Sequence, residues 1–539
     1  MKITLCQINP TVGAINQNKK SIFDWYHRAV DLGADLVIFP ELSLIGYPPQ
    51  DLLLRNRFIE NAKNALDEIA QKSTIPIILG NTMMEDNKLY NCAFFCEKGE
   101  IISHYKKRLL PTYDVFDEAR YFTSGSEPCV VKVSINGENV YLGLQICEDL
   151  WDKNYSCDLV EELKAKGAEI IINLSASPYR VDRLLDRCEL IQSKASDNRL
   201  SYLYCNLVGA QDELIFDGQS LAYNENGELI AQGKAFEEEI LMVDVKNSQT
   251  IDLIDSRREE KIYNALVLGV KDYFKKTGHT EAVIGLSGGI DSSLTACIAV
   301  DALGIENVHG VSMPSKFSSQ HSKDDAKLLS ENLGVDYRTI SIESIVSSFE
   351  ESLKTSYNGS ELGVAEENIQ ARARGSIIMA LSNKFNWLVL STGNKTELAM
   401  GYCTLYGDMN GGLSVISDLS KTDVYALSRW VNEKAGFDCI PINSIEKPPS
   451  AELAPNQVDP FDYDVVSPLV TALIDNQKSP SELIKEGADP GLVKDISNRI
   501  RTNEYKRRQA APGLRVTSKA FGIGRRVPIV NQFDELNND

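Results

Sequence analysis

The chain has 539 residues and a formal net charge of −20, with 43% hydrophobic and 24% charged residues. This length exceeds what one hydrophobic core usually supports, so we expect two domains. The composition is that of an ordinary soluble globular protein. The negative charge argues against nucleic acid or an anionic membrane as a partner. No apolar run is long enough to span a bilayer, and eleven cysteines without C-x-x-C pairs are typical of reduced thiols in the cytoplasm.

The first half alternates short apolar strands with amphipathic helices. The pattern predicts strands over 36–39, 75–79 and 170–174, and helices over 55–71 and 181–198. A hairpin is expected over 131–147, with Asn136-Gly137 as a type I′ turn. Strands with hairpins between them and helices to cover the sheets favour a layered α/β sandwich.

Three strand or loop ends in this half carry chemical groups. Glu41 follows a buried strand, Lys107 lies in a basic run, and Cys147 ends an apolar strand. Taken singly, each has an ordinary structural explanation: a solvated carboxylate, a wet basic face and a core thiol. Taken together, and in this chain order, they resemble the Glu-Lys-Cys trio of the nitrilase-superfamily amidases. The K-x-x-L-P spacing of that family selects Lys107 rather than the adjacent Lys106.

The resemblance implies a defined chemistry for these residue types. Cys147 attacks a carboxamide as a thiolate. Glu41 takes the thiol proton and later hands it to the departing ammonia. Lys107 supplies fixed positive charge where the tetrahedral oxyanion grows.

The sequence motifs around these residues indicate which amide is the substrate, again by resemblance. C-E-D-L-W, L-P-x-Y-x-V-F-D-E-x-R and N-x-S-x-S-P are similar to the glutaminase domains of NAD synthetases. That likeness implies that Tyr113, Ser177 and Arg183 hold glutamine and that Glu118 supports the trio. A guanidinium fork such as that of Arg183 also suits the α-carboxylate of glutamine.

Two other kinds of glutaminase are less compatible with the sequence. A Cys-His enzyme needs a histidine partner, and none of the five histidines lies in a recognisable signature near Cys147. An N-terminal-nucleophile enzyme needs cysteine at position 2, where this chain has Lys2. The strand pattern stops in polar residues after Val243, and we place the domain boundary near Ile251, giving domains 1–250 and 251–539.

The second half is organised around one glycine-rich stretch. An apolar run, 282–284, leads into G-L-S-G-G-I-D-S-S, and a helical pattern follows. Such a loop presents backbone N–H groups to phosphate, and Asp291 adds a carboxylate for Mg²⁺. There is neither a Walker A lysine nor a G-x-G-x-x-G pattern. The string resembles the pyrophosphate loop of ATP pyrophosphatases, which split ATP into AMP and pyrophosphate.

Beyond this loop, strand and helix patterns alternate. Strands are expected over 282–286, 308–312, 335–340 and 386–390, and helices over 292–303 and 322–333. The pattern predicts an open parallel sheet with ligands beyond the carboxyl ends of its strands. Thr392 and Glu397 follow the last of these strands, at the same edge as the glycine loop.

This half resembles NAD synthetases throughout, in strings such as E-N-I-Q-A-R-A-R-G, S-T-G-N-K-T-E and K-P-P-S-A-E-L. The resemblance implies an ATP site made of Gly285, Leu286, Ser287, Gly288, Gly289, Ile290, Asp291, Ser292, Thr392, Lys421 and Ser450. It implies that Mg²⁺ lies on Asp291 and Glu397, and deamido-NAD on Asn368, Glu397 and Lys519. We expect the segment Val516 to Arg526, rich in basic residues and glycine, to be mobile before ligand binds.

The sequence therefore predicts a nitrilase-like α-β-β-α sandwich followed by an open parallel-sheet ATP-pyrophosphatase domain. The implied activity is ATP-dependent amidation of deamido-NAD through an adenylate, with ammonia from glutamine. Expected partners are these small molecules and further copies of the chain, at least a dimer by family resemblance, in the cytoplasm. Two alternatives stay open: a GMP synthetase-like amidating enzyme and a tRNA-modifying protein with the same loop.

Overall fold

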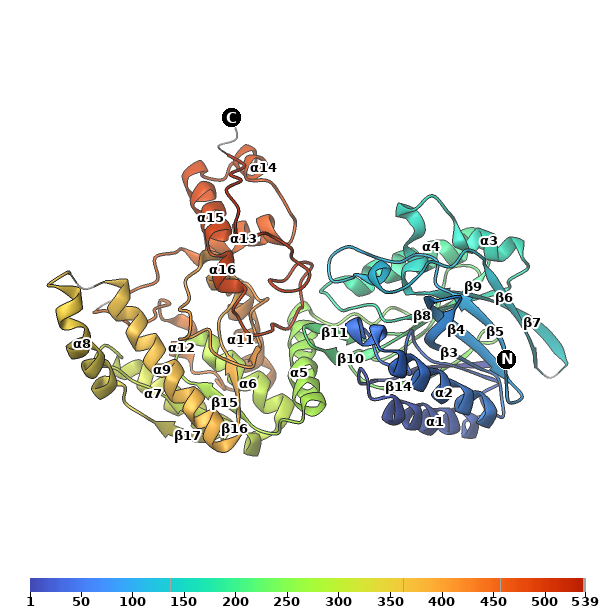
Figure 1. Cartoon of the computed structure of the whole chain (residues 1–539), viewed down its shortest axis with the longest axis horizontal. Coiled ribbons are helices and arrows are strands. Elements are labelled where there is room, and N and C mark those ends of the chain that lie inside the picture. Colours follow the sequence, from blue (N-terminus) through green and yellow to red (C-terminus); the bar gives the residue numbers. More distant parts are fainter. Residues whose placement is uncertain (136, 362, 456, 537–539) are drawn as a thin grey trace. The chain divides into compact units, whose positions relative to one another are not determined.

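The chain folds as two compact units, Met1–Ser256 and Arg257–Asp539, in a computed structural model that describes residues 1–135, 137–361, 363–455 and 457–536 (Figure 1). The division falls a few residues after the boundary predicted near Ile251. The predicted turn residue Asn136 lies outside the described residues. Within the part of the chain that is described, no helix has both the length and the apolar character needed to cross a membrane.

The N-terminal unit contains two mixed six-stranded sheets. The first has the order β14 (Glu239–Asp244), β1 (Lys2–Gln7), β2 (Leu36–Ile38), β3 (Ile77–Glu85), β4 (Lys88–Glu97) and β5 (Glu100–Lys106). The second has the order β13 (Leu229–Gln232), β12 (Leu221–Tyr223), β9 (Ser201–Asn206), β8 (Ile170–Ser175), β7 (Glu138–Ile146) and β6 (Cys129–Ile135). A separate hairpin joins β10 (Val208–Gln211) to β11 (Leu214–Asp217).

The two sheets pack face to face because their strands are apolar on both sides. Leu5 and Leu36 of the first sheet meet Leu144 and Ile172 of the second in one buried cluster. The outer faces are covered by helices, α1 (Ile15–Asp31) and α2 (Asn56–Lys72) on the first sheet, and α3 (Leu159–Ala165) and α4 (Arg183–Asn198) on the second. This is the predicted α-β-β-α sandwich.

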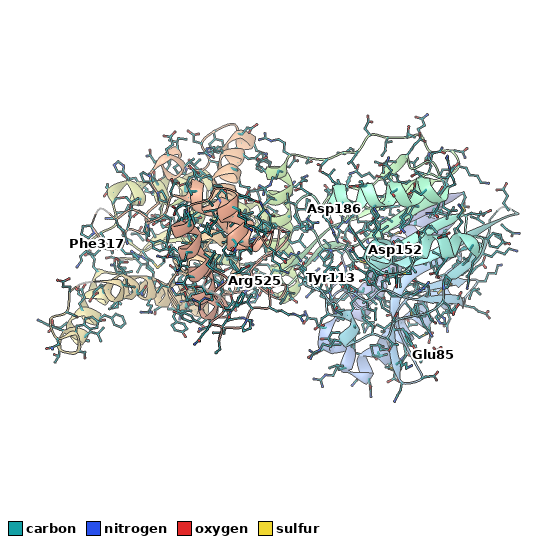
Figure 2. The ribbon with its side chains drawn as sticks, turned by 90° about the horizontal axis from the view of Figure 1, so that it is seen from above. Glu85, Tyr113, Asp152, Asp186, Phe317 and Arg525 are labelled. Atoms are coloured by element: carbon teal, nitrogen blue, oxygen red, sulfur yellow. The ribbon has the colours of Figure 1, made fainter. Side chains whose placement is uncertain are left out.

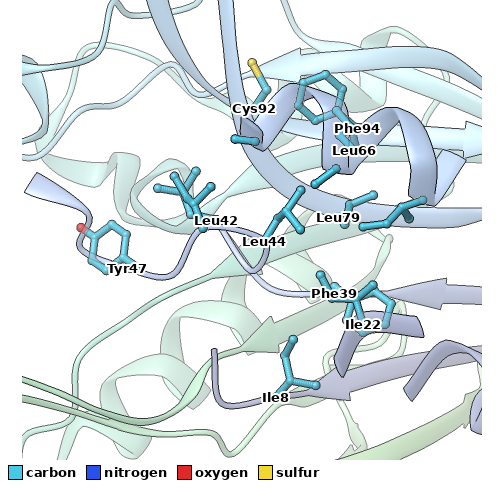
Figure 3. Close-up of a cluster of buried hydrophobic side chains, with 14 of the residues drawn as sticks. Ile8, Ile22, Phe39, Leu42, Leu44, Tyr47, Leu66, Leu79, Cys92 and Phe94 are labelled. Atoms are coloured by element: carbon cyan, nitrogen blue, oxygen red, sulfur yellow. The ribbon is translucent and has the colours of Figure 1, made fainter. Parts of the chain in front are cut away.

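Helix α2 shows why this covering forms and how it positions a loop. Its buried residues recur at the three- and four-residue spacing of one helix face, as in Ala62, Leu66 and Ile69. That face packs against the loop after β2, where Phe39 and Leu42 enter the same apolar cluster (Figure 3). Glu41, between these two anchors, is thereby held in a fixed place.

The C-terminal unit contains a parallel sheet of five strands. Its order is β17 (Asp336–Thr339), β16 (Val308–Ser312), β15 (Ala282–Gly285), β18 (Leu388–Ser391) and β19 (Leu413–Ser414). The chain order reverses between β15 and β18, and in such sheets the crevice beyond the strand ends at the reversal is where ligands bind. The glycine loop follows β15 and the Thr392 segment follows β18, as the sequence predicted.

Twelve helices accompany this sheet in the described residues. They are α5 (Arg258–Thr277), α6 (Ile290–Leu303), α7 (Gln320–Leu333), α8 (Glu343–Tyr357), α9 (Val364–Phe385), α10 (Lys395–Met400), α11 (Lys421–Ala435), α12 (Ile442–Glu446), α13 (Tyr463–Ile474), α14 (Pro480–Lys485), α15 (Pro490–Thr502) and α16 (Glu504–Arg507). Helix α9 packs Ile378 against Val283 and Val311 of the sheet. Short 3₁₀ turns complete the chain at η1 (Gln50–Leu54), η2 (Glu118–Arg120), η3 (Cys147–Asn154) and η4 (Ile305–Asn307).

The first part of the segment that we expected to be mobile is anchored. The backbone N–H groups of Val516 and Thr517 donate to the Asp418 carboxylate at 2.8 and 2.7 Å. The Ser518 hydroxyl donates to the Asp475 carbonyl at 3.1 Å. Buried polar partners therefore hold the backbone of residues 516–518, and the mobility of the segment before ligand binds stays a prediction.

Candidate active sites

The first site is built around a fully buried ammonium. Lys107 Nζ lies 2.7 Å from Glu41 Oε1 and 2.8 Å from Glu118 Oε1, and the three side chains are almost entirely excluded from solvent. The neighbouring Lys106 is instead partly exposed and pairs with Glu85. The structure thus brings Lys107, not Lys106, to Glu41.

Glu41 is held by more than this ion pair. Asn91 donates to its Oε1 at 2.8 Å, and the backbone N–H of Ala176 donates to its Oε2 at 3.0 Å. Strand β3 passes directly beneath it at Gly80, where a Cβ would lie only 2.7 Å from the Glu41 Cα. These contacts fix a carboxylate that burial would otherwise penalise.

Cys147 is the first residue after β7, where the strand turns abruptly into η3. Its φ of +43° lies in the left-handed region, which a residue with a Cβ adopts only under tight constraint. Asp149 supplies part of that constraint, since its carboxylate accepts from the Ile146 N–H at 2.9 Å and the Leu109 N–H at 3.0 Å. One side chain therefore ties the strand end that carries Cys147 to the segment that follows Lys107.

The electrostatics of the trio follow from burial and from shared charge. Burial, reinforced by the charge of Glu41, raises the pKa of the Cys147 thiol, so the resting sulfur is protonated. Burial opposes the Lys107 ammonium, but Glu118 and Glu41 outweigh it and raise its pKa above the usual range. Burial raises the pKa of Glu118 to about 7, against the attraction of Lys107. A proton acceptor is thus required before Cys147 can act as a nucleophile.

Two of the predicted glutamine-binding residues contact residues that follow Cys147 in the chain. The Tyr113 hydroxyl donates to Glu148 at 2.9 Å, and Arg183 stacks on Trp151 with 4.1 Å between guanidinium carbon and ring centre. Figure 2 labels Tyr113, together with Asp186, which lies one turn along α4 and 4.0 Å from Arg183.

Ser177 is held from beneath by a buried ion pair. Arg187 donates to the Ser177 carbonyl at 2.9 Å. Its Nη1 also donates to both carboxylate oxygens of Asp217, at 2.9 and 2.8 Å. The sequence reasoning missed Arg187, Glu148, Asn91 and Asp149. Glu148 and Asp149 follow the candidate nucleophile directly, which was a usable signal. The sequence around Asn91 and around Arg187 contains no motif that would have identified either residue as part of the site.

The second site lies at the glycine loop. Gly288 has a φ of +77°, and a Cβ there would stand 2.1 Å from the Ser322 carbonyl oxygen, so only glycine fits. The Ser287 hydroxyl accepts from the Gly289 N–H at 3.1 Å and lies 3.1 Å from the Ser292 hydroxyl. Helix α6 begins at Ile290, so the loop leads into a helix N-terminus that favours an anion.

Two carboxylates and one ammonium face each other beside this loop. Lys421 Nζ contacts Asp291 and lies 3.3 Å from Glu397 Oε1. Asn394, which caps α10, donates to Asp291 Oδ1 at 2.9 Å. Burial and the nearby Asp291 charge raise the pKa of Glu397 to about 8. Lys421 is the first residue of α11, where a lysine is often solvated. Here it is buried and paired with two carboxylates.

A cavity of about 320 Å³ opens over these groups, a size that suits a nucleotide-scale ligand. Every predicted ATP-site residue except Gly288 lines it: Gly285, Leu286, Ser287, Gly289, Ile290, Asp291, Ser292, Thr392, Lys421 and Ser450. Glu397 lines it too, whereas Asn368 and Lys519 do not. Asn368 accepts from Thr404 at 2.7 Å, and the Lys519 carbonyl accepts from Lys395 at 2.8 Å. Three further cations line the cavity, Lys323, Arg374 and Lys447, and none of them was among the predicted site residues.

The donor set at Asp291 and Glu397 fits Mg²⁺. Both groups are carboxylates, the oxygen donors that Mg²⁺ prefers, and both contact the same Lys421 ammonium. Among the described residues no group of three or more His, Cys, Asp or Glu could hold a metal ion. Mg²⁺ at nucleotide sites is commonly held by one or two carboxylates together with substrate phosphates, and two carboxylates meet that need.

Comparisons with known proteins agree with the two-unit organisation. A family described as carbon-nitrogen hydrolase matches residues 2–255, and one described as NAD synthase matches residues 262–510. The chain is 42% identical, over an alignment of 581 residues, to a glutamine-dependent NAD(+) synthetase of Thermotoga maritima, and the alignment covers 99% of each chain. It is 44% identical over 561 residues to one of Synechocystis sp., covering 98% of this chain and 99% of the relative.

A solved structure extends the likeness to three dimensions. The glutamine-dependent NAD+ synthetase from Acinetobacter baumannii in complex with adenosine diphosphate is 38% identical and superimposes with a TM-score of 0.80. The match covers 100% of this chain and 99% of that one. Identity at this level over the full length shows the family. The chain therefore belongs to the glutamine-dependent NAD(+) synthetases.

Proposed function

We propose that this chain converts deamido-NAD to NAD⁺, using ATP to activate the acid and glutamine to supply the nitrogen. The observation that carries the proposal is the buried Glu41–Lys107–Glu118 cluster at Cys147, in a chain whose second unit holds a glycine-loop nucleotide cavity. An amide-hydrolysing centre and an ATP-activating centre in one polypeptide are the two halves of such an amidation.

The glutaminase half would begin with glutamine held by Tyr113, Ser177 and Arg183. Glu41 takes the proton of the Cys147 thiol, and the thiolate attacks the side-chain amide carbon. Lys107 stabilises the oxyanion of the tetrahedral intermediate. Glu41 returns the proton to the leaving nitrogen, ammonia departs, and a thioester remains. Glu41 then deprotonates water, which attacks the thioester, so that glutamate leaves and the thiol is restored.

The synthetase half would bind ATP on the residues that line the cavity and on Gly288. A nicotinate carboxylate oxygen of deamido-NAD attacks the α-phosphorus, and the bond to pyrophosphate breaks. The loop N–H groups and Lys421 hold the negative charge that moves onto pyrophosphate. Mg²⁺, held by Asp291 and Glu397, would supply further positive charge beside the phosphate oxygens.

Ammonia would then attack the acyl carbon of the adenylate, lose a proton and displace AMP, leaving the amide of NAD⁺. We assign the dinucleotide contacts to Asn368, Glu397 and Lys519. The two-site design answers two chemical problems. A carboxylate is a poor acyl donor until it is adenylated, and ammonia is mostly protonated at neutral pH unless it is released where it is used.

The test is to incubate the purified chain with deamido-NAD, Mg·ATP and glutamine labelled at its side-chain nitrogen. The proposal expects labelled NAD⁺, AMP, pyrophosphate and glutamate in equal amounts. Amidation of a purine nucleotide acid, or of a tRNA base, without NAD⁺ formation would favour one of the alternative functions. The homo-oligomer and the cytoplasmic location stay predictions.

A further inference from the structure

The first turn of α10 sends its side chains in three directions. Glu397 faces the nucleotide cavity beside Asp291. The Thr396 hydroxyl accepts from the backbone N–H of Lys421 at 3.1 Å. Lys395 points elsewhere and reaches the C-terminal segment. One short helix start therefore touches both the predicted metal carboxylates and a segment more than a hundred residues further along the chain.

The Lys395 ammonium lies in a cage of five oxygens. It contacts Asp475 Oδ1 and Oδ2 at 2.8 and 2.7 Å, Asp418 Oδ1 at 2.9 Å, the Thr517 hydroxyl at 2.8 Å and the Lys519 carbonyl at 2.8 Å. Its side chain is 1% exposed, as is that of Asp418, so water does not share these contacts. Three N–H donors are thus fully occupied by protein.

The two carboxylates extend the cage to the neighbouring backbone. Asp418 accepts from the N–H groups of Val516 and Thr517, and the Asp475 carbonyl accepts from the Ser518 hydroxyl. With the carbonyl of the next residue bound by Lys395, all four residues from 516 to 519 are tied to one buried cluster. The backbone that carries the Lys519 side chain is consequently fixed.

Desolvation cancels much of the attraction in a buried ion cluster, so such a cluster is weak evidence for stability and better evidence for a defined geometry. We propose that Lys395, with Asp418 and Asp475, is a positioning residue that holds Lys519 where deamido-NAD binds. The inference rests on the proposed function, in which Lys519 contacts the dinucleotide. Lys395 itself touches no substrate.

Because Lys395 and Glu397 share one helical turn, the same element positions a cation for the dinucleotide and a carboxylate for Mg·ATP. The cage acts on the C-terminal segment, whereas the capping contacts of Asn394 and Thr396 act on the ATP side. Disturbing the cage therefore weakens dinucleotide binding and leaves ATP binding in place.

The experiment uses the full-length enzyme with ammonium as nitrogen donor, so that glutamine chemistry plays no part. Thr517→Val removes the hydroxyl that meets Lys395, and Thr517→Ser is its matched control, which keeps it. Asp475→Asn and Lys395→Met remove larger parts of the cage. Loss of a buried hydrogen bond to a charged group predicts a KM for deamido-NAD raised about tenfold in Thr517→Val and Asp475→Asn. The KM for ATP should stay within about twofold in the same variants.

A second measurement reads the anchoring directly, without catalysis. Amide hydrogen exchange over residues 514–521 should become faster in Thr517→Val, Asp475→Asn and Lys395→Met, and stay slow in Thr517→Ser. Glutaminase activity, from the other unit, should be unchanged in all four. Unchanged exchange in Asp475→Asn, or equal rises in the KM for ATP and for deamido-NAD, would overturn the proposal. A wild-type enzyme that makes no NAD⁺ would instead refute the proposed function, and the exchange data would still decide the anchoring.

Discussion

At the scale of single residues, the glutaminase site depends on an excess of negative charge around one ammonium. Glu41 and Glu118 both contact Lys107, and all three are buried. One cation cannot fully compensate two carboxylates out of water, which is why the pKa of Glu118 rises to about 7. Glu41 accepts two further hydrogen bonds, from the Asn91 side chain and from the Ala176 N–H. Of the two carboxylates, Glu41 acts more strongly on the Cys147 thiol, which favours Glu41 as the proton acceptor.

A first prediction concerns stability and pH. Because the pKa of Glu118 is raised in the folded protein from 4.5 to about 7, the folded state keeps a proton that the unfolded chain releases in this window. Stability should therefore fall as pH rises from about 4.5 to 7, and Glu118→Gln should remove that part of the slope. Thermal unfolding at intervals across this range measures it. An identical pH profile in the wild type and the variant would contradict the assignment.

A second prediction concerns Lys421, the cation between Asp291 and Glu397. Removing one member of a buried charge cluster leaves the others uncompensated, which is more damaging than removing an exposed charge. Lys421→Met should lower the rate of ammonium-dependent NAD⁺ synthesis at least about a hundredfold while leaving glutamine hydrolysis intact. Steady-state assays of the two half reactions separate these effects. Equal loss of both activities would show general damage.

At the scale of elements, close backbone approach decides where reactive groups can stand. Gly80 lets β3 pass beneath Glu41, and Gly288 lets the phosphate loop lie against the Ser322 carbonyl. Neither requirement depends on the chemistry of a side chain. Each comes from two chain segments sharing a space too small for a Cβ.

A third prediction tests the phosphate loop. Gly288→Ala places a Cβ 2.1 Å from a backbone oxygen and adds the strain of a φ of +77°. ATP binding, measured by calorimetry, should weaken at least about tenfold because the loop must move to relieve both. Gly278→Ala is the matched control, since its φ of +83° imposes similar strain but no atom lies within 4 Å of the added Cβ. Similar ATP affinities in the two variants would contradict the proposed effect of the collision at Gly288.

A fourth prediction tests the turn that presents the nucleophile. Asp149 joins the end of β7 to the segment after Lys107 through several buried hydrogen bonds. Asp149→Ala leaves these donors unsatisfied and should lower the free energy of unfolding of the N-terminal unit by about 2–4 kcal/mol. Asp149→Asn keeps the shape and some acceptors, so it should lose less. Denaturant unfolding compares them, and equal stability of wild type and Asp149→Ala would contradict this role.

Much of this organisation was predictable from the sequence, for identifiable reasons. Periodic apolar patterns placed β8, α2 and α4 within a residue or two, because burial on one face dictates the spacing. The glycine loop could be predicted from the sequence because its backbone conformation requires glycine. Contacts between residues far apart in the sequence could not be predicted. Asn91 and Glu41 are 50 positions apart, and Lys395 and Thr517 are 122 positions apart. Such contacts depend on sheet order and loop paths, which local pattern does not encode.

At the scale of the whole molecule, the two units divide one reaction between them. The first holds the thiol, its acceptor and its ammonium, and the second holds the phosphate loop, the paired carboxylates and the cavity. Each group of residues lies in the unit that matches one family, carbon-nitrogen hydrolase for the first unit and NAD synthase for the second. The central claim is that nitrogen freed at Cys147 is joined to an acid activated in the other unit.

The most direct measurement is NAD⁺ formation by Cys147→Ala with glutamine and, separately, with ammonium. The account predicts that activity with glutamine is lost and that activity with ammonium is retained, because only the first needs the thiol. Cys188→Ala, which alters another buried thiol of the same unit, is the control and should keep both activities. Wild-type rates with glutamine in Cys147→Ala would contradict the account.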